Sequence, residues 1–129
     1  MNQLTGVIEE IKSVEGITQV FVEVEDKILS VLILSGDEEH KEGERVNLLF
    51  KETEVMIATP ESQVSARNSF VSRITSISIE EILAEVAFDF YGKKITSIIT
   101  RGALNELKCQ VDDEFRWLVK SNEISIQKG

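Results

Sequence analysis

The feature that most constrains this chain is an internal duplication. Apolar residues of the first half recur in the second half at a constant offset of 66 positions. The matched pairs include Leu4 and Phe70, Ile8 and Ile74, Val22 and Phe88, and Val24 and Phe90. Beyond Gly102 the offset becomes 69, so the second copy carries three extra residues before Phe115. One module of roughly 60 residues written twice predicts two small, similar folding units.

Most of each copy alternates between apolar and polar residues, which is the pattern of half-buried β-strands. Segments 20–25 and 85–90 show it most clearly, and turns are predicted at 25–27 and 91–93. The extra residues fall in 103–107, which is predicted to be a short helix with Thr100 as a cap upstream. The first copy has the polar segment 37–43 at this place, for which only a turn or a single helical turn is expected.

About five short strands and at most one short helix per copy predict an all-β fold. We expect two tandem OB-fold-like small Greek-key β-barrels, with a short helix in the second. The predicted boundaries are 1–59 for the first unit, 60–64 for a linker that contains the only proline, and 65–129 for the second unit. A single barrel of this size has a marginal core. Stability is therefore expected from packing of the two copies, from exchanged strands or from association between chains.

Charge and composition narrow the function classes. A net charge of −9 argues against nucleic acid and anionic membranes, because both are bound through basic faces. A few local donors can still bind a small anion, since charges beyond roughly 8 Å are largely screened at physiological salt. The apolar runs are too short to span a membrane, and the first residues lack the pattern of a signal peptide. With its single Cys109, the chain is expected to be cytoplasmic.

The tetrapeptide Ser65-Ala66-Arg67-Asn68 opens the second copy and offers the groups that an oxyanion site needs. Ser65 supplies a hydroxyl, Ala66 an N–H without steric bulk, and Arg67 a guanidinium. In isolation, such a segment is more often a solvated turn. The sequence contains no convincing nucleophile, acid/base pair or cluster of metal ligands. Catalysis is therefore not expected.

Three segments in order resemble the molybdate-binding Mop family of TOBE domains: the tetrapeptide, residues 95–100 and residues 118–121. Residues 51–58 resemble the final strand of the same family in the first copy. The resemblance covers nearly the whole chain in two tandem units. It implies OB-like barrels, homo-oligomers that are typically trimers, and molybdate or tungstate held at subunit interfaces.

The resemblance also implies which residues bind the oxyanion. The Ser65-Ala66-Arg67 segment supplies one side of a site, and Lys120 with Ser121 supplies another. Thr100 adds a hydroxyl, and Lys51 is expected to complete a site with the 65–67 segment of a neighbouring chain. Neither direct ligands for a metal cation nor an organic cofactor is expected.

The first copy departs from this pattern. It begins Met1-Asn2-Gln3, so the Ser, Ala and Arg of the tetrapeptide have no counterparts. Glu52 stands where the second copy has Ser121, and Leu34 stands in place of Thr100. A carboxylate repels a dianion and removes a donor. Sites built from the first copy are therefore expected to be absent or altered.

Two functions are compatible with these features. The first is a cytoplasmic oxyanion-binding protein that stores, buffers or delivers molybdate or tungstate in molybdenum homeostasis. The alternative is a degenerate TOBE pair that acts as a protein-interaction or regulatory module without binding an anion. The departures of the first copy motivate this alternative.

Overall fold

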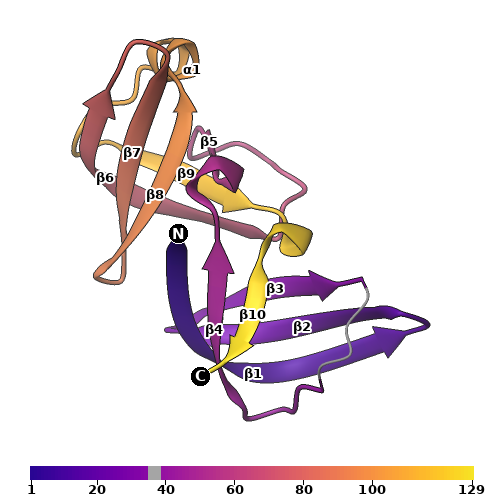
Figure 1. Ribbon diagram of the computed structural model, residues 1–129. Helices are drawn as coiled ribbons and strands as arrows, with labels where there is room; N and C mark the ends of the chain where they lie inside the picture. Colours follow the sequence, from indigo (N-terminus) through magenta and orange to yellow (C-terminus); the bar gives the residue numbers. More distant parts are fainter. Residues whose placement is uncertain (35–38) are drawn as a thin grey trace.

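Two five-stranded antiparallel sheets make up the fold (Figure 1). The computed structural model describes residues 1–34 and 39–129. The first sheet has the order β10-β4-β1-β2-β3, with β1 (Asn2–Val14), β2 (Ile17–Val24), β3 (Lys27–Ile33), β4 (Arg45–Phe50) and β10 (Ser125–Lys128). The second has the order β5-β9-β6-β7-β8, with β5 (Met56–Ala58), β6 (Asn68–Ile79), β7 (Leu83–Phe90), β8 (Lys93–Thr100) and β9 (Glu114–Val119). The helices are η1 (Glu52–Glu54), α1 (Arg101–Leu107) and η2 (Ser121–Glu123).

Both sheets are curled, and the only α-helix among the described residues lies in the second copy, so the predicted fold class is confirmed. Thr100 caps α1, because its hydroxyl oxygen accepts a hydrogen bond of 3.1 Å from the N–H of Ala103. Of the polar segment 37–43, residues 37 and 38 lie outside the described residues, and Glu42 with Gly43 forms a turn. No described helix has the length and apolar character that a bilayer span requires.

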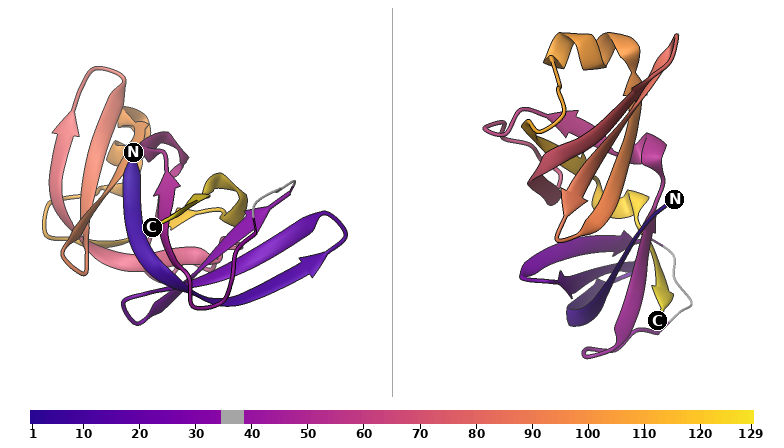
Figure 2. Two further views of the ribbon diagram at one scale, coloured as in Figure 1. Left: turned by 60° about the horizontal axis from the view of Figure 1, so that its bottom comes forward. Right: turned by 90° about the vertical axis from the view of Figure 1, so that its left-hand side faces the viewer.

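Each sequence copy contributes its last strand to the other sheet. β5 comes from the first copy but pairs with β9, and β10 comes from the second copy but pairs with β4. In Figures 1 and 2 the yellow β10 accordingly lies among the purple strands of the first sheet. Exchanged strands were one of the three expected sources of stability. Because each barrel draws on both copies, neither half of the chain contains all five strands of a sheet.

The duplication extends to irregular features of the strands. A β-bulge interrupts the pairing of β1 between Ile8 and Glu10, and another interrupts β6 between Ile74 and Ser76. These bulges are 66 positions apart, which is the offset of the sequence repeat. A bulge increases local twist and bends a strand, so both sheets bend at the same place.

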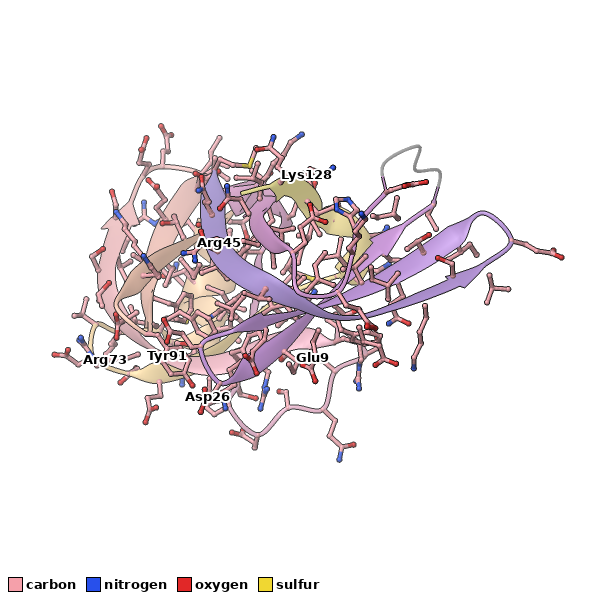
Figure 3. All side chains as sticks on the ribbon, turned by 90° about the horizontal axis from the view of Figure 1, so that it is seen from below. Glu9, Asp26, Arg45, Arg73, Tyr91 and Lys128 are labelled. Carbon is pink, nitrogen blue, oxygen red and sulfur yellow. The ribbon has the colours of Figure 1, made fainter. Side chains whose placement is uncertain are left out.

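The hairpin turns predicted at 25–27 and 91–93 are both present, and their tips meet. The hydroxyl of Tyr91 donates a hydrogen bond to the carboxylate of Asp26. Figure 3 labels these two residues close to each other. This contact lowers the pKa of Asp26 and raises the pKa of Tyr91. It ties the β2–β3 turn of the first sheet to the β7–β8 turn of the second.

The core runs without interruption from one sheet to the other. Trp117 of β9 is fully buried, as expected for a core residue of the second barrel. It also stacks on Phe50 of β4, with ring centroids 6.0 Å apart and an interplanar angle of 11°. Its indole N–H donates to the hydroxyl of Ser72. The two barrels therefore share one hydrophobic core.

Candidate functional site

The pairing of β6 with β9 brings the two expected halves of the site together. Asn68 begins β6 and lies opposite Val119, the last residue of β9. In an antiparallel pair, the residues that precede one strand lie beside those that follow the other. The 65–67 segment is therefore next to Lys120 and Ser121, at one end of the second sheet.

Asn68 fixes this end of the second sheet to the first sheet. Its amide oxygen accepts a hydrogen bond of 2.7 Å from the N–H of Ser30, and its amide nitrogen donates to the carbonyl of Ser30 at 2.9 Å. The hydroxyl of Ser121 donates to the hydroxyl of Ser30 at 3.0 Å. Asn68 is fully buried, so these bonds are shielded from water. Ser30 of β3 thus positions both halves of the candidate site.

The cations at this end have no anionic partner within the described residues. Arg67 and Lys120 are exposed, and neither forms an ion pair in the described part of the chain. The guanidinium of Arg67 makes only a long hydrogen bond of 3.4 Å to the carbonyl of Val64. Ser65 is exposed, whereas Ala66 is 9% exposed. Two positive charges and a hydroxyl are therefore available to an anion.

The structure places Thr100 and Lys51 elsewhere in the chain. The hydroxyl of Thr100 caps α1, and Thr100 pairs with Leu83 of β7, beside the end of β6 that is opposite to Asn68. Lys51 follows β4 and lies beside Met1 and Asn2, because Asn2 pairs with Phe50. Among the described residues, no hydrogen bond or ion pair joins Lys51 to the tetrapeptide. Its predicted role requires a second copy of the chain.

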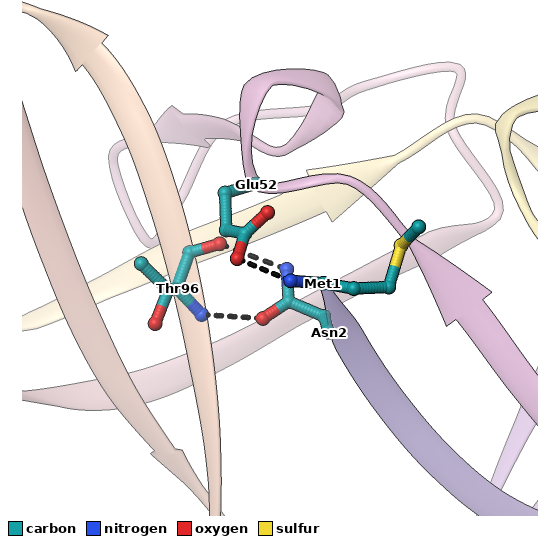
Figure 4. A network of polar contacts seen from close by, with 4 residues as sticks. All are labelled: Met1, Asn2, Glu52 and Thr96. Atoms are coloured by element: carbon teal, nitrogen blue, oxygen red, sulfur yellow. Dashed lines mark hydrogen bonds and ion pairs between the residues drawn. The ribbon is translucent and has the colours of Figure 1, made fainter.

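The equivalent end of the first copy has the same scaffold but a different charge arrangement (Figure 4). The amide of Asn2 donates to the carbonyl of Thr96 at 2.9 Å and accepts from its N–H at 2.8 Å. Beside it, the amino group of Met1 lies 2.5 Å from the carboxylate of Glu52. The hydrogen bond from this amino group lowers the pKa of Glu52. Glu52 is therefore a paired carboxylate.

Sequence reasoning missed the function of the two asparagines. Asn2 and Asn68 are repeat partners at the offset of 66, and so are Ser30 and Thr96. Four polar residues at one repeat offset, each within or next to an apolar strand, are a signal for a pair of buried hydrogen-bonded contacts. Each asparagine begins a strand of one sheet and bonds to a strand of the other, which the repeat alone does not indicate.

The two 3₁₀-helices meet through a pair of glutamates. Glu54 of η1 and Glu123 of η2 are repeat partners at the offset of 69. Interaction with the neighbouring Glu123 carboxyl group, through hydrogen bonding and then through charge, raises the pKa of Glu54. Deprotonation of both at neutral pH leaves a repulsive pair between the two copies.

Replacing Glu54 with Gln is expected to raise the unfolding temperature at pH 7. A carboxyl group with a raised pKa in the folded state stabilises the fold below its unfolded pKa, and this contribution is lost as pH rises. The gain should therefore disappear below the unfolded pKa of a glutamate, at about pH 4, where Glu54 of the wild type is protonated. Thermal unfolding of both proteins across this pH range checks it.

The matched control for that experiment is Glu106→Gln in α1, which removes the same charge from an exposed position. A gain that is equal in the two variants, or that is independent of pH, would contradict the role of the Glu54–Glu123 pair.

A groove of ≈ 560 Å³ lies away from the expected oxyanion-binding residues. It is bordered by Lys27 of the first sheet and by residues of β6, β7 and β9, including Phe70, Asp89 and Arg116. None of the expected oxyanion-binding residues lines it. The candidate site is therefore a cluster of exposed donors and not this groove.

Comparisons with known proteins place the chain in a family. The model of the TOBE domain matches twice, over residues 1–57 and 64–126. A crystal structure of the cytoplasmic molybdate-binding protein ModG, with molybdate bound, has a very similar fold, with a TM-score of 0.92 at 20% sequence identity. The similarity covers 99% of this chain and 96% of that protein. A search of curated proteins gave no match. The chain belongs to the TOBE domain family, with two copies of the domain in tandem.

Proposed function

We propose that this protein binds molybdate or tungstate through the residues gathered at the start of β6 and the end of β9. The observation that carries the proposal is the convergence of Ser65, Ala66 and Arg67 with Lys120 and Ser121. The structurally similar ModG binds molybdate, which supports the same class of ligand here. The residues that converge are five of the seven that are expected to bind the oxyanion, since Thr100 and Lys51 lie elsewhere in the chain.

The chemistry of the cluster suits a tetrahedral dianion. Molybdate accepts hydrogen bonds and donates none, so its site should consist of donors. The N–H groups of Ser65 and Ala66, the guanidinium of Arg67 and the ammonium of Lys120 are all donors. Phosphate keeps a proton near neutral pH and would need an acceptor for it. The cluster therefore favours a fully deprotonated oxyanion over phosphate.

The proposed role is storage, buffering or delivery of the oxyanion in the cytoplasm, without covalent chemistry. The donors are exposed, so a single chain surrounds the ion on one side only. We propose that copies of the chain associate, most simply as a trimer, and that Lys51 of a neighbouring copy completes the site. Sedimentation with and without molybdate measures this association. A stable monomer under both conditions would contradict a shared site.

Replacing Arg67 or Lys120 with Ala is expected to weaken oxyanion binding by about 10- to 100-fold. Each substitution removes a charge-assisted hydrogen bond, of about 1.5–3 kcal/mol. Isothermal titration with molybdate, tungstate, sulfate and phosphate measures the effect. Arg101→Ala, which removes an exposed cation at the start of α1, is the matched control and should bind as the wild type does. The absence of heat and of thermal stabilisation with molybdate and tungstate would refute the proposed function.

The Glu52–Met1 ion pair favours one alternative function. It fills the first-copy position with charges from the chain itself, as expected of a domain pair that has lost anion binding. Such a protein would act as an interaction or regulatory module. Co-purification of a stoichiometric protein partner, with no anion bound, would support this alternative.

A further inference from the structure

The chain contains two positions with the same backbone scaffold. Four pairs of residues correspond through the repeat: Met1 and Arg67, Asn2 and Asn68, Lys51 and Lys120, Glu52 and Ser121. The strand register is also the same, since Asn2 lies opposite Phe50 and Asn68 lies opposite Val119. The two positions therefore differ in the donors Ser65 and Ala66, which the repeat does not match in the first copy, and in the side chains at the matched pairs, above all Glu52 against Ser121.

The two positions differ in whether a carboxylate lies beside the local positive charge. In the second copy, Arg67 and Lys120 form no ion pair with any described carboxylate. In the first copy, the position equivalent to Ser121 holds the Glu52 carboxylate, which lies 2.5 Å from the Met1 amino group. The side chain of Glu52 is 31% exposed, so an arriving oxyanion would meet it directly.

We propose that Glu52 determines which of the two positions binds: its carboxylate stands in for the oxyanion in the first copy and keeps the oxyanion out. The carboxylate already accepts the hydrogen bond of the local cation, as an oxyanion would. It also repels a dianion at short range. The protein would therefore bind one oxyanion per chain, at the second-copy position alone. This inference rests on the proposed function.

The test is the number of molybdate ions bound per chain in Glu52→Ser, which restores the residue of the second copy. Isothermal titration and native mass spectrometry of protein without an amino-terminal tag both report it. We expect one ion per chain in the wild type and two in E52S. Glu52→Gln removes the charge with little change in size and should also gain a site, which covers the case in which E52S folds poorly.

The reciprocal substitution, Ser121→Glu, should weaken binding at the second-copy position by on the order of 100-fold, because it places a carboxylate beside Arg67 and Lys120. Glu61→Ser is the matched control, since Glu61 is exposed in the linker, and it should leave the number of ions at one.

The outcomes separate this inference from the proposed function. Two ions per chain in the wild type, or one in both E52S and E52Q, would overturn the role of Glu52 and leave the proposed function standing. Binding by E52S but not by the wild type would support the role of Glu52 and refute the second-copy site. The absence of binding in every variant would refute both.

Discussion

Replacing Trp117 with Ala is expected to lower the free energy of unfolding by about 3–5 kcal/mol. The side chain is fully buried, and three rings pack around it, those of Phe50, Phe70 and Phe90. Alanine would leave a cavity that this dense core can fill only in part. Phe50 belongs to the first sheet, so the cavity would weaken the packing of one barrel on the other.

Chemical denaturation followed by circular dichroism measures this effect. Trp117 is the only tryptophan, so its fluorescence is not available in the variant. Trp117→Phe is the matched control. It keeps an aromatic ring but loses the hydrogen bond to Ser72, so a smaller loss of about 1–3 kcal/mol is expected. A loss below about 1 kcal/mol in the alanine variant would show that Trp117 does not link the two sheets.

Local features of this fold could be predicted from the sequence because they depend on neighbouring residues. The alternation of apolar residues predicts the strands, and segment 103–107 was expected to be helical, where α1 lies. Thr100 was identified as a cap because capping involves residues only three positions apart. The repeat offset then carried these features from one copy to the other, as the equivalent bulges show.

The sequence leaves three sources of stability open and does not indicate that strand exchange is the one present. β5 is only three residues long, and its apolar pattern fits either sheet equally well. A strand pattern gives the face that is buried but not the partner strand. The partners are set by contacts between residues far apart in sequence, such as Ile57 with Trp117.

The candidate site also has some features that follow from the sequence and others that depend on contacts between distant residues. The donors of the tetrapeptide follow from residue types, whereas the conflict at Glu52 follows from the resemblance to Mop domains and from the repeat, which matches Glu52 with Ser121. The ion pair of Glu52 with the Met1 amino group and the contact of Asn68 with Ser30 were not, since each joins distant parts of the chain. The sequence therefore indicated which groups could bind an anion, and the structure shows what holds them in place.

Replacing Asn68 with Leu is expected to lower the free energy of unfolding by about 1–3 kcal/mol for each of the two Ser30 backbone groups that lose their partner. Both groups are buried, and leucine offers them neither a donor nor an acceptor. The same change should weaken oxyanion binding, because Asn68 anchors the adjacent segment 65–67 to the first sheet. Denaturation and isothermal titration measure the two effects separately.

Asn2→Leu is the matched control, because Asn2 makes the equivalent pair of hydrogen bonds to Thr96. It should cost a similar amount of stability, since both asparagines are buried and bridge the two sheets. It should lower the affinity for the oxyanion less than Asn68→Leu does, because Asn2 does not anchor residues 65–67. Equal losses of affinity in the two variants would mean that binding depends on overall stability and not on the anchoring of residues 65–67.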